Sequence, residues 1–319
     1  MQIRVQKILR NEFVLCIVTI SLLVIFSSCT SRITDSENNN SHAVDPVGKK
    51  EYFELASWNI ENFPKNDSKT INKVKQIIRD LDVDMYGVQE ITDAAAFNTL
   101  IDSLPGWKGI LSADEYSSGT YQKTGIIFNT DFISISSARN IFENDSYAFP
   151  RPPLTAYVQI KDLDGVKFDF NIIVVHLKAN SGGDNTSNED RRKSACDKLE
   201  IYIENEINSG SDPDFIVLGD WNDQIDDSIH TEALGVFLKH TQQYLFLTLG
   251  LEQESYIKDP YKSLIDHILI TEDSFVEYGN GQTEVRYLDS ELSSSYLSDI
   301  SDHRPVVARF RGFKLSLAP

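Results

Sequence analysis

A short polar segment in the second half of the chain follows a run of residues that predicts a buried strand. The residues from Phe215 to Leu218 are apolar and partly β-branched, and Gly219 ends the run. Asp220 and Asn222 come two residues apart, so we expect both side chains to point to the same side. A carboxylate and a carboxamide at the end of a buried strand are costly unless they bind a metal ion, a phosphate or a reacting water. A simple Asx-type turn is the alternative for this segment taken alone.

Polar residues of this kind stand at the ends of other apolar runs as well. The whole set comprises Asn59, Glu90, His176, Asp220 with Asn222, Asp266, and Asp302 with His303. Asn59 follows a predicted strand at residues 53–58, helical spacing appears at residues 71–81, and Glu90 stands near the end of a second strand at residues 84–91. A strand, a helix and a strand form a parallel unit, whose ligands collect beyond the C-terminal ends of the strands. We therefore expect Asn59 and Glu90 to face one crevice.

A single domain has to position these residues, because no boundary or short repeat interrupts residues 51–313. The further predicted elements are a helix at residues 94–101, a strand at 124–128, a hairpin of residues 152–160 and 166–175 joined by a turn at 162–165, a helix at 188–207, and strands at 264–270 and 306–310. Residues 314–319 form a C-terminal tail. The chain of 319 residues is long enough to bury a sizeable core.

Residues 1–28 resemble a bacterial secretion signal that ends at a lipoprotein cysteine. Three basic residues precede an apolar run at residues 13–26, which is too short to span a bilayer comfortably. Cys29 follows and is the expected lipid anchor, with an ordinary cleaved signal as the alternative. Residues 29–50 are polar and predict a flexible tether. These features predict an exported protein of the cell envelope that is held at a membrane.

The charge and the cysteines limit the possible functions. The whole chain has a net charge of −18, and residues 1–28 contain three basic and one acidic residue, which leaves about −20 for the rest. This balance argues against non-specific binding of nucleic acid through charge alone, but it does not exclude a hydrolase that contacts phosphates locally. Beyond Cys16 and Cys29 the only cysteine is Cys196, which stands in a helical apolar pattern. We expect Cys196 to pack in the core, and no intrachain disulfide.

Taken in order from Trp58 to Arg304, the polar motifs resemble those of the endonuclease/exonuclease/phosphatase superfamily. Its members include pancreatic deoxyribonuclease, apurinic endonucleases, inositol polyphosphate phosphatases and bacterial sphingomyelinases. One Gly-Asp-x-Asn motif would be a weak signal, whereas six motifs in family order are a specific one. The resemblance implies an α+β fold, a four-layer α/β/β/α sandwich of two mixed β-sheets flanked by helices.

The resemblance also implies a divalent metal site and a water-activating pair. Asn59 and Glu90, helped by Asp302, match the positions that hold the ion. We expect Mg²⁺, with Mn²⁺ or Ca²⁺ as alternatives, because hard cations prefer oxygen ligands. Asp220 and Asn222 match the residues that orient the attacking water and hold the phosphoryl oxygens.

Two histidines match catalytic positions of the family. His303 matches the principal one, and Asp266 matches the carboxylate that fixes its tautomer and increases its basicity. His176 matches a second histidine, which a glutamate orients in deoxyribonuclease I. The corresponding region here, residues 119–124, offers Gln122 instead. A glutamine can hydrogen-bond to His176 but cannot balance an imidazolium charge.

Two short segments resemble secreted nucleases related to deoxyribonuclease I, namely His176-Leu177-Lys178 and the stretch Phe149-Pro150-Arg151-Pro152-Pro153-Leu154. The resemblance implies that Arg151 and Lys178, together with Asn222, bind substrate phosphate. Arg191 or Arg192 would supply a further contact. For Arg151 taken alone, a solvated turn residue is the alternative.

The leading hypothesis is a metal-dependent nuclease that hydrolyses DNA or RNA by in-line attack of an activated water. Its partners would be nucleic acid, bound transiently, and a membrane, bound through the lipid anchor, with no obligate protein partner. The alternative is a phosphatase or a phospholipase C-like enzyme of the same superfamily. The sphingomyelinases carry an exposed aromatic hairpin, but residues 240–261 do not clearly predict one, and residues 245–247 are expected in the core. A non-catalytic binding module is the third hypothesis, although no expected site residue is missing.

Overall fold

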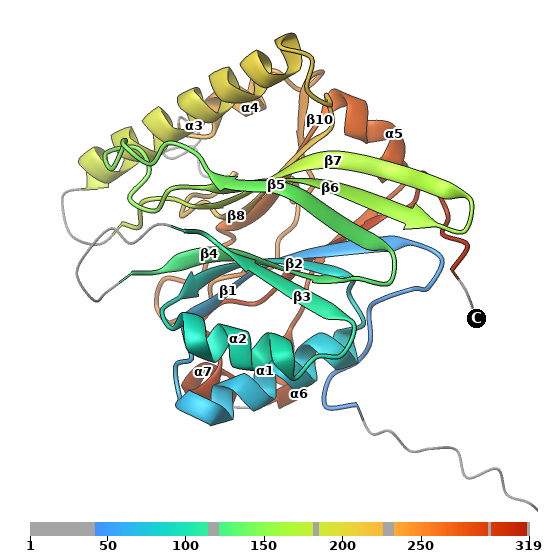
Figure 1. Cartoon of the computed structure of the whole chain (residues 1–319). Helices are drawn as coiled ribbons and strands as arrows, with labels where there is room; N and C mark the ends of the chain where they lie inside the picture. Colours follow the sequence, from blue (N-terminus) through green and yellow to red (C-terminus); the bar gives the residue numbers. More distant parts are fainter. Residues whose placement is uncertain (1–41, 114–120, 181–184, 226–232, 293–294, 318–319) are drawn as a thin grey trace, which may run out of the picture. The chain divides into compact units, whose positions relative to one another are not determined.

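The computed structural model describes residues 42–113, 121–180, 185–225, 233–292 and 295–317 (Figure 1). These belong to one compact unit that begins at His42. The predicted signal peptide, Cys29 and the tether up to residue 41 lie outside the described residues. Within the described ranges, no helix is long and apolar enough to cross a membrane.

The first sheet has six strands in the order β11-β12-β1-β2-β4-β3. Its strands are β1 (Phe53–Phe63), β2 (Met85–Ile91), β3 (Trp107–Leu111), β4 (Lys123–Asn129), β11 (Gln282–Val285) and β12 (Val306–Phe310). Only β1 and β2 run parallel, joined by helix α1 (Asp67–Leu81), and the other pairs are antiparallel. The sheet is therefore mixed, and the predicted strand–helix–strand unit is confirmed.

The second sheet also has six strands, in the order β5-β6-β7-β8-β10-β9. Its strands are β5 (Ile133–Asn140), β6 (Leu154–Asp162), β7 (Gly165–His176), β8 (Phe215–Asp220), β9 (Tyr244–Phe246) and β10 (Asp266–Thr271). The predicted hairpin is β6 and β7, and its turn leads directly into a long antiparallel ladder. β7 and β8 run parallel, connected by helix α3 (Asn185–Asn208).

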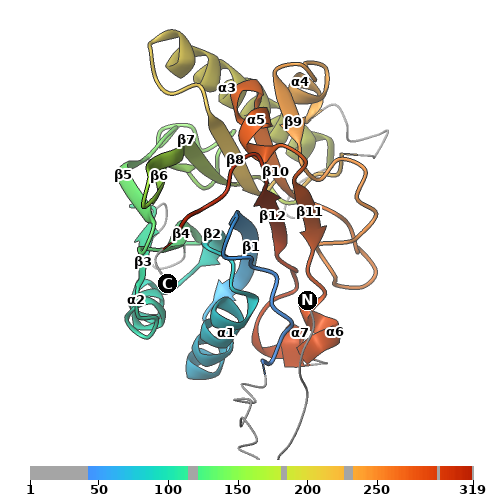
Figure 2. The same ribbon diagram turned by 90° about the vertical axis from the view of Figure 1, so that its right-hand side faces the viewer.

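The two sheets pack face to face with helices on both outer faces (Figure 1). Helices α1, α2 (Ala94–Asp102), α6 (Leu288–Leu292) and α7 (Ser295–Asp299) lie on the side of the first sheet, whereas α3 and α4 (Gly235–Leu238) lie on the side of the second. The short segments η1 (Glu272–Ser274) and α5 (Phe275–Tyr278) follow β10. Figure 2 shows α3 and α4 at the opposite end of this unit from α1, α6 and α7. The predicted four-layer sandwich is confirmed.

Three apolar clusters hold the four layers together, one between the sheets and one between each sheet and its helices. The pattern of α1 explains its contribution, because Val74, Ile77, Ile78 and Leu81 lie on one face and are all buried. Cys196 is buried in the cluster beneath α3, where burial raises the pKa of its thiol, as expected for a packing residue. The expected core position of residues 245–247 is also met, since Phe246 and Leu247 are buried.

Several elements differ from their predicted form. β1 does not end at residue 58 but continues to Phe63, so that Asn59 lies within the strand. β3, β5, β9 and β11 were not predicted; all four are edge strands and carry fewer buried residues than the central strands. Residues 42–50 were expected to belong to the flexible tether. They pack against the first sheet's helices instead, with Val44 and Val47 buried and the amide N–H of Val47 donating to the Leu81 carbonyl.

Candidate active site

The register of the second sheet brings three of the candidate residues to one edge. Asp220 is the last residue of β8, and it pairs with His176, the last residue of the parallel strand β7. On its other side Asp220 pairs with Asp266, the first residue of the antiparallel strand β10. The edge therefore presents a histidine and two carboxylates on adjacent strands, and all three are buried.

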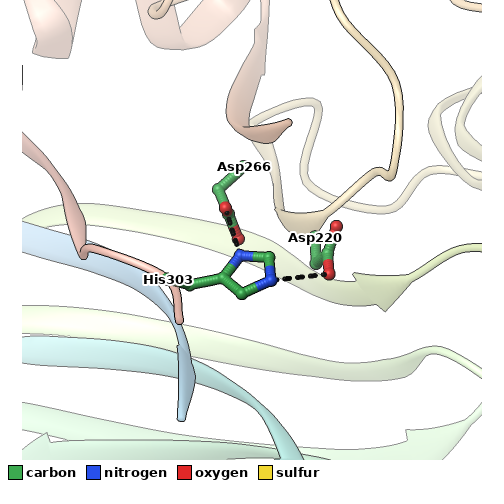
Figure 3. Close-up of side chains that lie close together, drawn as sticks. All are labelled: Asp220, Asp266 and His303. Carbon is green, nitrogen blue, oxygen red and sulfur yellow. Dashed lines mark hydrogen bonds and ion pairs between the residues drawn. The ribbon is translucent and has the colours of Figure 1, made fainter. Parts of the chain in front are cut away.

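His303 lies between the two carboxylates (Figure 3). Its Nδ1 is 2.8 Å from an oxygen of Asp266, and its Nε2 is 3.8 Å from an oxygen of Asp220. The backbone N–H of His303 donates to Ser301 Oγ at 2.9 Å, and the Ser301 hydroxyl in turn donates to the carbonyl of Asn59. These bonds tie the loop that carries His303 to β1 and fix the imidazole at the sheet edge.

The charges around His303 shift its pKa and that of Asp220. Burial lowers the pKa of His303, but the negative charges of the Asp266 and Asp220 carboxylates outweigh this effect and raise the pKa to about 10. Burial and the charge of Asp266 raise the pKa of Asp220 to about 7, against the opposing effect of His303. The three ligand atoms lie within 4.8 Å of one another, which is close enough to hold a metal ion. A charged imidazole has no free lone pair, however, so the geometry fits proton handling better than metal ligation.

Four carboxylates line the adjoining crevice, and they fit a hard divalent cation. They are Glu61, Glu90, Asp220 and Asp302. Burial raises the pKa of Asp302 to about 6, and the charges of Glu61 and Glu90 add to this against that of His303. A cation would relieve this repulsion, and an all-oxygen donor set matches Mg²⁺.

Asn59 hydrogen-bonds to the neighbouring carboxylates and to the backbone of its own strand. Its amide nitrogen donates to Glu90 at 3.2 Å and to Asp220 at 3.0 Å, while its oxygen accepts the N–H of Glu61 at 3.0 Å. Asn59 thus holds the two carboxylates in place, and its oxygen is directed to the backbone instead of the acidic group. Glu90 itself has a left-handed backbone, with φ of 64°, at an irregularity in the pairing of β2.

Asn222 lines the crevice and lies beyond the strand in a left-handed conformation with φ of 55°. Its backbone N–H donates to Asp220 at 2.9 Å, which is the Asx-type turn considered as the simple alternative, and its side chain donates to the Leu177 carbonyl at 3.2 Å. The turn and the candidate site are therefore the same structure. Gly219 permits it, since a Cβ there would lie 1.9 Å from the Val175 carbonyl oxygen.

His176 faces the acidic side of the crevice. Its Nε2 is 3.5 Å from Asp220 and 3.8 Å from Glu90, whereas its Nδ1 is buried without a hydrogen-bond partner in the described part of the chain. Burial, followed by the charges of Arg151 and His303, lowers its pKa well below the usual value, so the ring is neutral. The possible bond from Gln122 to His176 is not formed, because Gln122 contacts Asn62 and Arg151.

Cationic side chains stand on the β7 side of the crevice. Arg151 donates to the Leu177 carbonyl at 3.3 Å, and Lys178 and Arg191 line the same adjoining hollow. The main crevice has a volume of about 1030 Å³ and the hollow one of about 460 Å³, and both are lined by Asn62, Gln122 and Arg151. Of the two arginines suggested as further contacts, Arg192 is fully buried and pairs with Asp223 at 3.3 Å. Of Arg191 and Arg192, only Arg191 lines the hollow.

The sequence matches the Endonuclease/Exonuclease/phosphatase family over residues 56–303, which is most of the chain and the whole of the site. The chain belongs to this family. Members of the family are phosphoester hydrolases, and the protein is an enzyme of that class. Comparison with curated proteins found no match.

Solved structures of the family share the fold. A mannosyl-6-phosphatase from Bacteroides thetaiotaomicron is 17% identical with a TM-score of 0.55, and the alignment covers 80% of this chain and 98% of that one. A humanized TDP2 from D. rerio is 14% identical with a TM-score of 0.59, covering 82% and 99%. The 3′ phosphatase NExo from Neisseria, bound to a product DNA hairpin, is 14% identical with a TM-score of 0.56, covering 81% and 99%. At these identities the likeness shows the fold alone.

Sequence reasoning missed several residues of this family site. Tyr256 packs its ring 5.0 Å from that of His303, and the Tyr296 hydroxyl donates to the His303 carbonyl at 2.5 Å. Ser255 Oγ accepts the N–H of Asp266 at 3.1 Å. Only Ser301 could have been found from the sequence, because it directly precedes Asp302 and His303. The others lie in segments without a motif.

Proposed function

We propose that the protein is a divalent-metal-dependent phosphodiesterase that hydrolyses nucleic acid by attack of an activated water. The observation that carries the proposal is the position of His303, whose Nδ1 bonds to Asp266 at 2.8 Å while its Nε2 faces Asp220. The carboxylates that fit a cation and the cationic side chain of Arg151 line the same crevice as this group. A phosphodiester needs this combination, because its anionic oxygens have to be bound while a water is deprotonated.

In this proposal Asp220 accepts a proton from the attacking water, and Asn222 orients that water against the phosphorus. His303, whose ring Asp266 holds in place, directs its Nε2 proton to the phosphate and gives that proton to the leaving sugar oxygen as the P–O bond to it breaks. His176 is neutral and donates from Nε2 to the same oxygens. A Mg²⁺ ion, or Mn²⁺ or Ca²⁺, bound by Glu90 and Asp302 would neutralise the charge that develops on the phosphate.

Arg151 and Lys178 would bind the substrate phosphates beside the reacting one. The guanidinium of Arg151 lies near His176 and lowers its pKa, so its charge acts directly at the reacting edge. A diester within a nucleic acid strand carries such neighbouring phosphates, whereas a small phosphomonoester does not. The cationic hollow therefore supports a nucleic acid substrate over the phosphatase alternative.

Nicking of supercoiled plasmid by the purified protein tests this proposal. We expect nicking with Mg²⁺, none with chelator, and a loss of about 10²- to 10⁴-fold in rate for His303→Ala. His240→Ala is the matched control, because His240 is exposed and does not line the crevice or the hollow. Failure of the folded protein to cleave plasmid, single strands or RNA would refute the nuclease proposal. Sugar phosphates and lipid phosphodiesters would then be the substrates to test.

We also propose that the enzyme is exported and anchored to a membrane of the cell envelope through Cys29. The support is the sequence of residues 1–29, with basic residues, an apolar run and a cysteine in that order. Metabolic labelling with a radioactive fatty acid should mark the wild-type protein and not Cys29→Ser. Equal labelling of the two proteins would contradict the anchor.

A further inference from the structure

Residues 255–263 form a small hairpin that borders the active site, although the sequence did not predict one there. The N–H of Tyr256 donates to the Ser263 carbonyl at 2.9 Å, and the N–H of Ser263 donates back at 3.0 Å. The N–H of Tyr261 donates to the Lys258 carbonyl at 2.9 Å and closes the turn. The segment thus has a defined shape.

The base of this hairpin is bonded to the loops that carry the catalytic group. The N–H of Ile257 donates to the Asp302 carbonyl at 2.9 Å, and the N–H of Arg304 donates to the Ser255 carbonyl at 2.7 Å. The ring of Tyr256 packs against His303 on the same side. The hairpin is therefore held at a fixed place beside the reacting edge, as a binding element needs to be.

The tip of the hairpin carries an aromatic ring between two cations. Tyr261 is 74% exposed, and Lys258 and Lys262 are exposed as well. All three side chains line the main crevice. Lys262 lies 3.2 Å from Asp259 across the turn, in an exposed pair that contributes little to stability. An exposed aromatic ring flanked by lysines is the arrangement by which proteins stack single-stranded bases and contact the backbone between them.

The order of the strands places the hairpin opposite the cationic residues already described. The second sheet runs β7-β8-β10, and Asp220 ends β8 in the middle. Lys178 follows β7, and Arg151 bonds to the Leu177 carbonyl on that side. The hairpin directly precedes β10 and so lies on the other side. Cations thus flank the reacting edge on both sides, in a chain whose net charge is −18.

We propose that the hairpin is a second substrate-binding wall, in which Tyr261 stacks on an unpaired nucleobase while Lys258 and Lys262 contact the adjoining phosphates. This inference rests on the proposed nuclease function and names its substrate class, a single-stranded nucleic acid that extends on both sides of the scissile phosphate. A paired base would not offer its face to Tyr261, so duplex is bound less well. Cleavage then occurs within a strand, because the substrate has to occupy both the hairpin and the cationic residues Arg151 and Lys178 on the other side of the reacting edge.

Binding of a labelled single-stranded 12-mer to the full chain, measured by fluorescence anisotropy with chelator present, tests the wall apart from the chemistry. Tyr261→Ala should weaken binding by roughly 5- to 100-fold, and Tyr261→Phe should bind as the wild type does, because stacking needs the ring and not the hydroxyl. Lys258→Ala with Lys262→Ala should lower the slope of log affinity against log salt by about 1. Lys108→Ala with Lys239→Ala is the matched control, since both lysines are exposed and do not line the crevice.

DNA and RNA 12-mers are compared in the same assay, and the better ligand identifies the sugar. Cleavage kinetics add a second readout, in which Tyr261→Ala raises KM for the 12-mer. Because the Tyr261 side chain is exposed, the variant should fold as the wild type does, and its thermal midpoint checks this. Unchanged 12-mer affinity in both the Tyr261→Ala and the double lysine variants would overturn the wall.

The outcomes also separate this inference from the proposed function. Cleavage that does not depend on Tyr261 or the lysines would refute the wall and leave the nuclease standing. Binding that depends on Tyr261 without any cleavage would support the wall and refute the nuclease. If Tyr261→Ala weakens sedimentation with phosphatidylglycerol vesicles and leaves 12-mer affinity unchanged, the hairpin is a membrane contact and the proposal is wrong.

Discussion

The two ends of the β8 segment each carry a carboxylate whose pKa is raised to about 7, but the two groups are in different surroundings. Asp220, at the C-terminal end, is buried and faces the imidazole of His303. Asp214 precedes the N-terminal end, is only partly buried, and accepts the Ser274 hydroxyl at 2.8 Å. Burial is the largest cause of the raised pKa in both.

The neighbouring charges distinguish the two ends. At Asp214 they are further carboxylates, Asp212 and Glu277, which add to the effect of burial. At Asp220 a carboxylate raises the pKa while His303 opposes it, and a crevice opens beside the pair. A raised pKa alone therefore does not mark a catalytic group. It does so where opposite charges and a cavity converge on it.

The largest expected effect is that of Asp220→Asn compared with Asp214→Asn. The first change removes the proton acceptor while keeping the shape of the side chain, so we expect kcat to fall by about 10²- to 10⁴-fold. The second change leaves the Ser274 bond possible and should leave kcat unchanged. Steady-state kinetics on a single-stranded oligonucleotide measure both. A similar loss in the two variants would show that the effect is on folding and not on chemistry.

Asp266→Asn should give the next largest effect. The amide keeps a hydrogen bond to His303 Nδ1 but removes the negative charge that holds the ring protonated, so kcat should fall by about 10²-fold with little change in KM. Kinetics on the same oligonucleotide test this. If KM rose and kcat were unchanged, Asp266 would serve binding instead of the reaction.

Metal binding sharpens the comparison from the acidic side. Mg²⁺ should raise the Tm of the wild-type protein, because an ion concentration of 100 times Kd adds about 2.7 kcal/mol to the free energy of unfolding. Glu90→Gln should reduce this rise in Tm. Asp212→Asn, in the carboxylate group around Asp214, should leave that rise intact. The readout is thermal unfolding with and without Mg²⁺, independent of activity. An equal reduction in both variants would indicate diffuse charge screening and not a site.

The sequence predicted the strands and the residues at their ends better than it predicted the bonds among them. The apolar runs locate β7, β8 and β10: β8 and β10 are buried along their length and β7 over its last five residues, and each carries a polar residue at the same edge of the sheet. That His176, Asp220 and Asp266 stand side by side depends on register, which the pairing of distant strands decides. The family order supplied what periodicity could not.

The remaining differences come from contacts between residues far apart in the chain. Gln122 bonds to Asn62 and Arg151, and no local pattern at residues 119–124 indicates either partner. The hairpin at residues 255–263 has too few apolar residues to show a strand period, and it is held by the loop of Asp302. Residues 42–50 look like a tether in composition, but two valines are enough to fix them to the domain. Composition predicts solvation only where no apolar surface is within reach.

The smallest expected effect concerns stability at the Asp214 end. Its pKa is about 7 in the folded protein against a usual value of 3.8, so the folded state keeps a proton that the unfolded chain has lost. The stabilisation is fully present below pH 3.8 and is lost as the pH rises through 7. Asp214→Asn is neutral at every pH and should not lose it. Because Asp214 is partly exposed, solvent screening reduces the effect to about 1 kcal/mol, or about 2 °C in Tm.

Thermal unfolding of Asp214→Asn and of the wild type, measured at several pH values between about 5 and about 8, checks this. The difference between the Tm of the variant and the Tm of the wild type should increase in favour of the variant as the pH rises, while the activity of the two proteins stays equal. A constant difference in Tm would mean that Asp214 is already ionised in the folded state at pH 5. The carboxylates at the two ends of β8 would then differ in pKa as well as in surroundings, and the raised pKa of Asp220 alone would set the catalytic end apart.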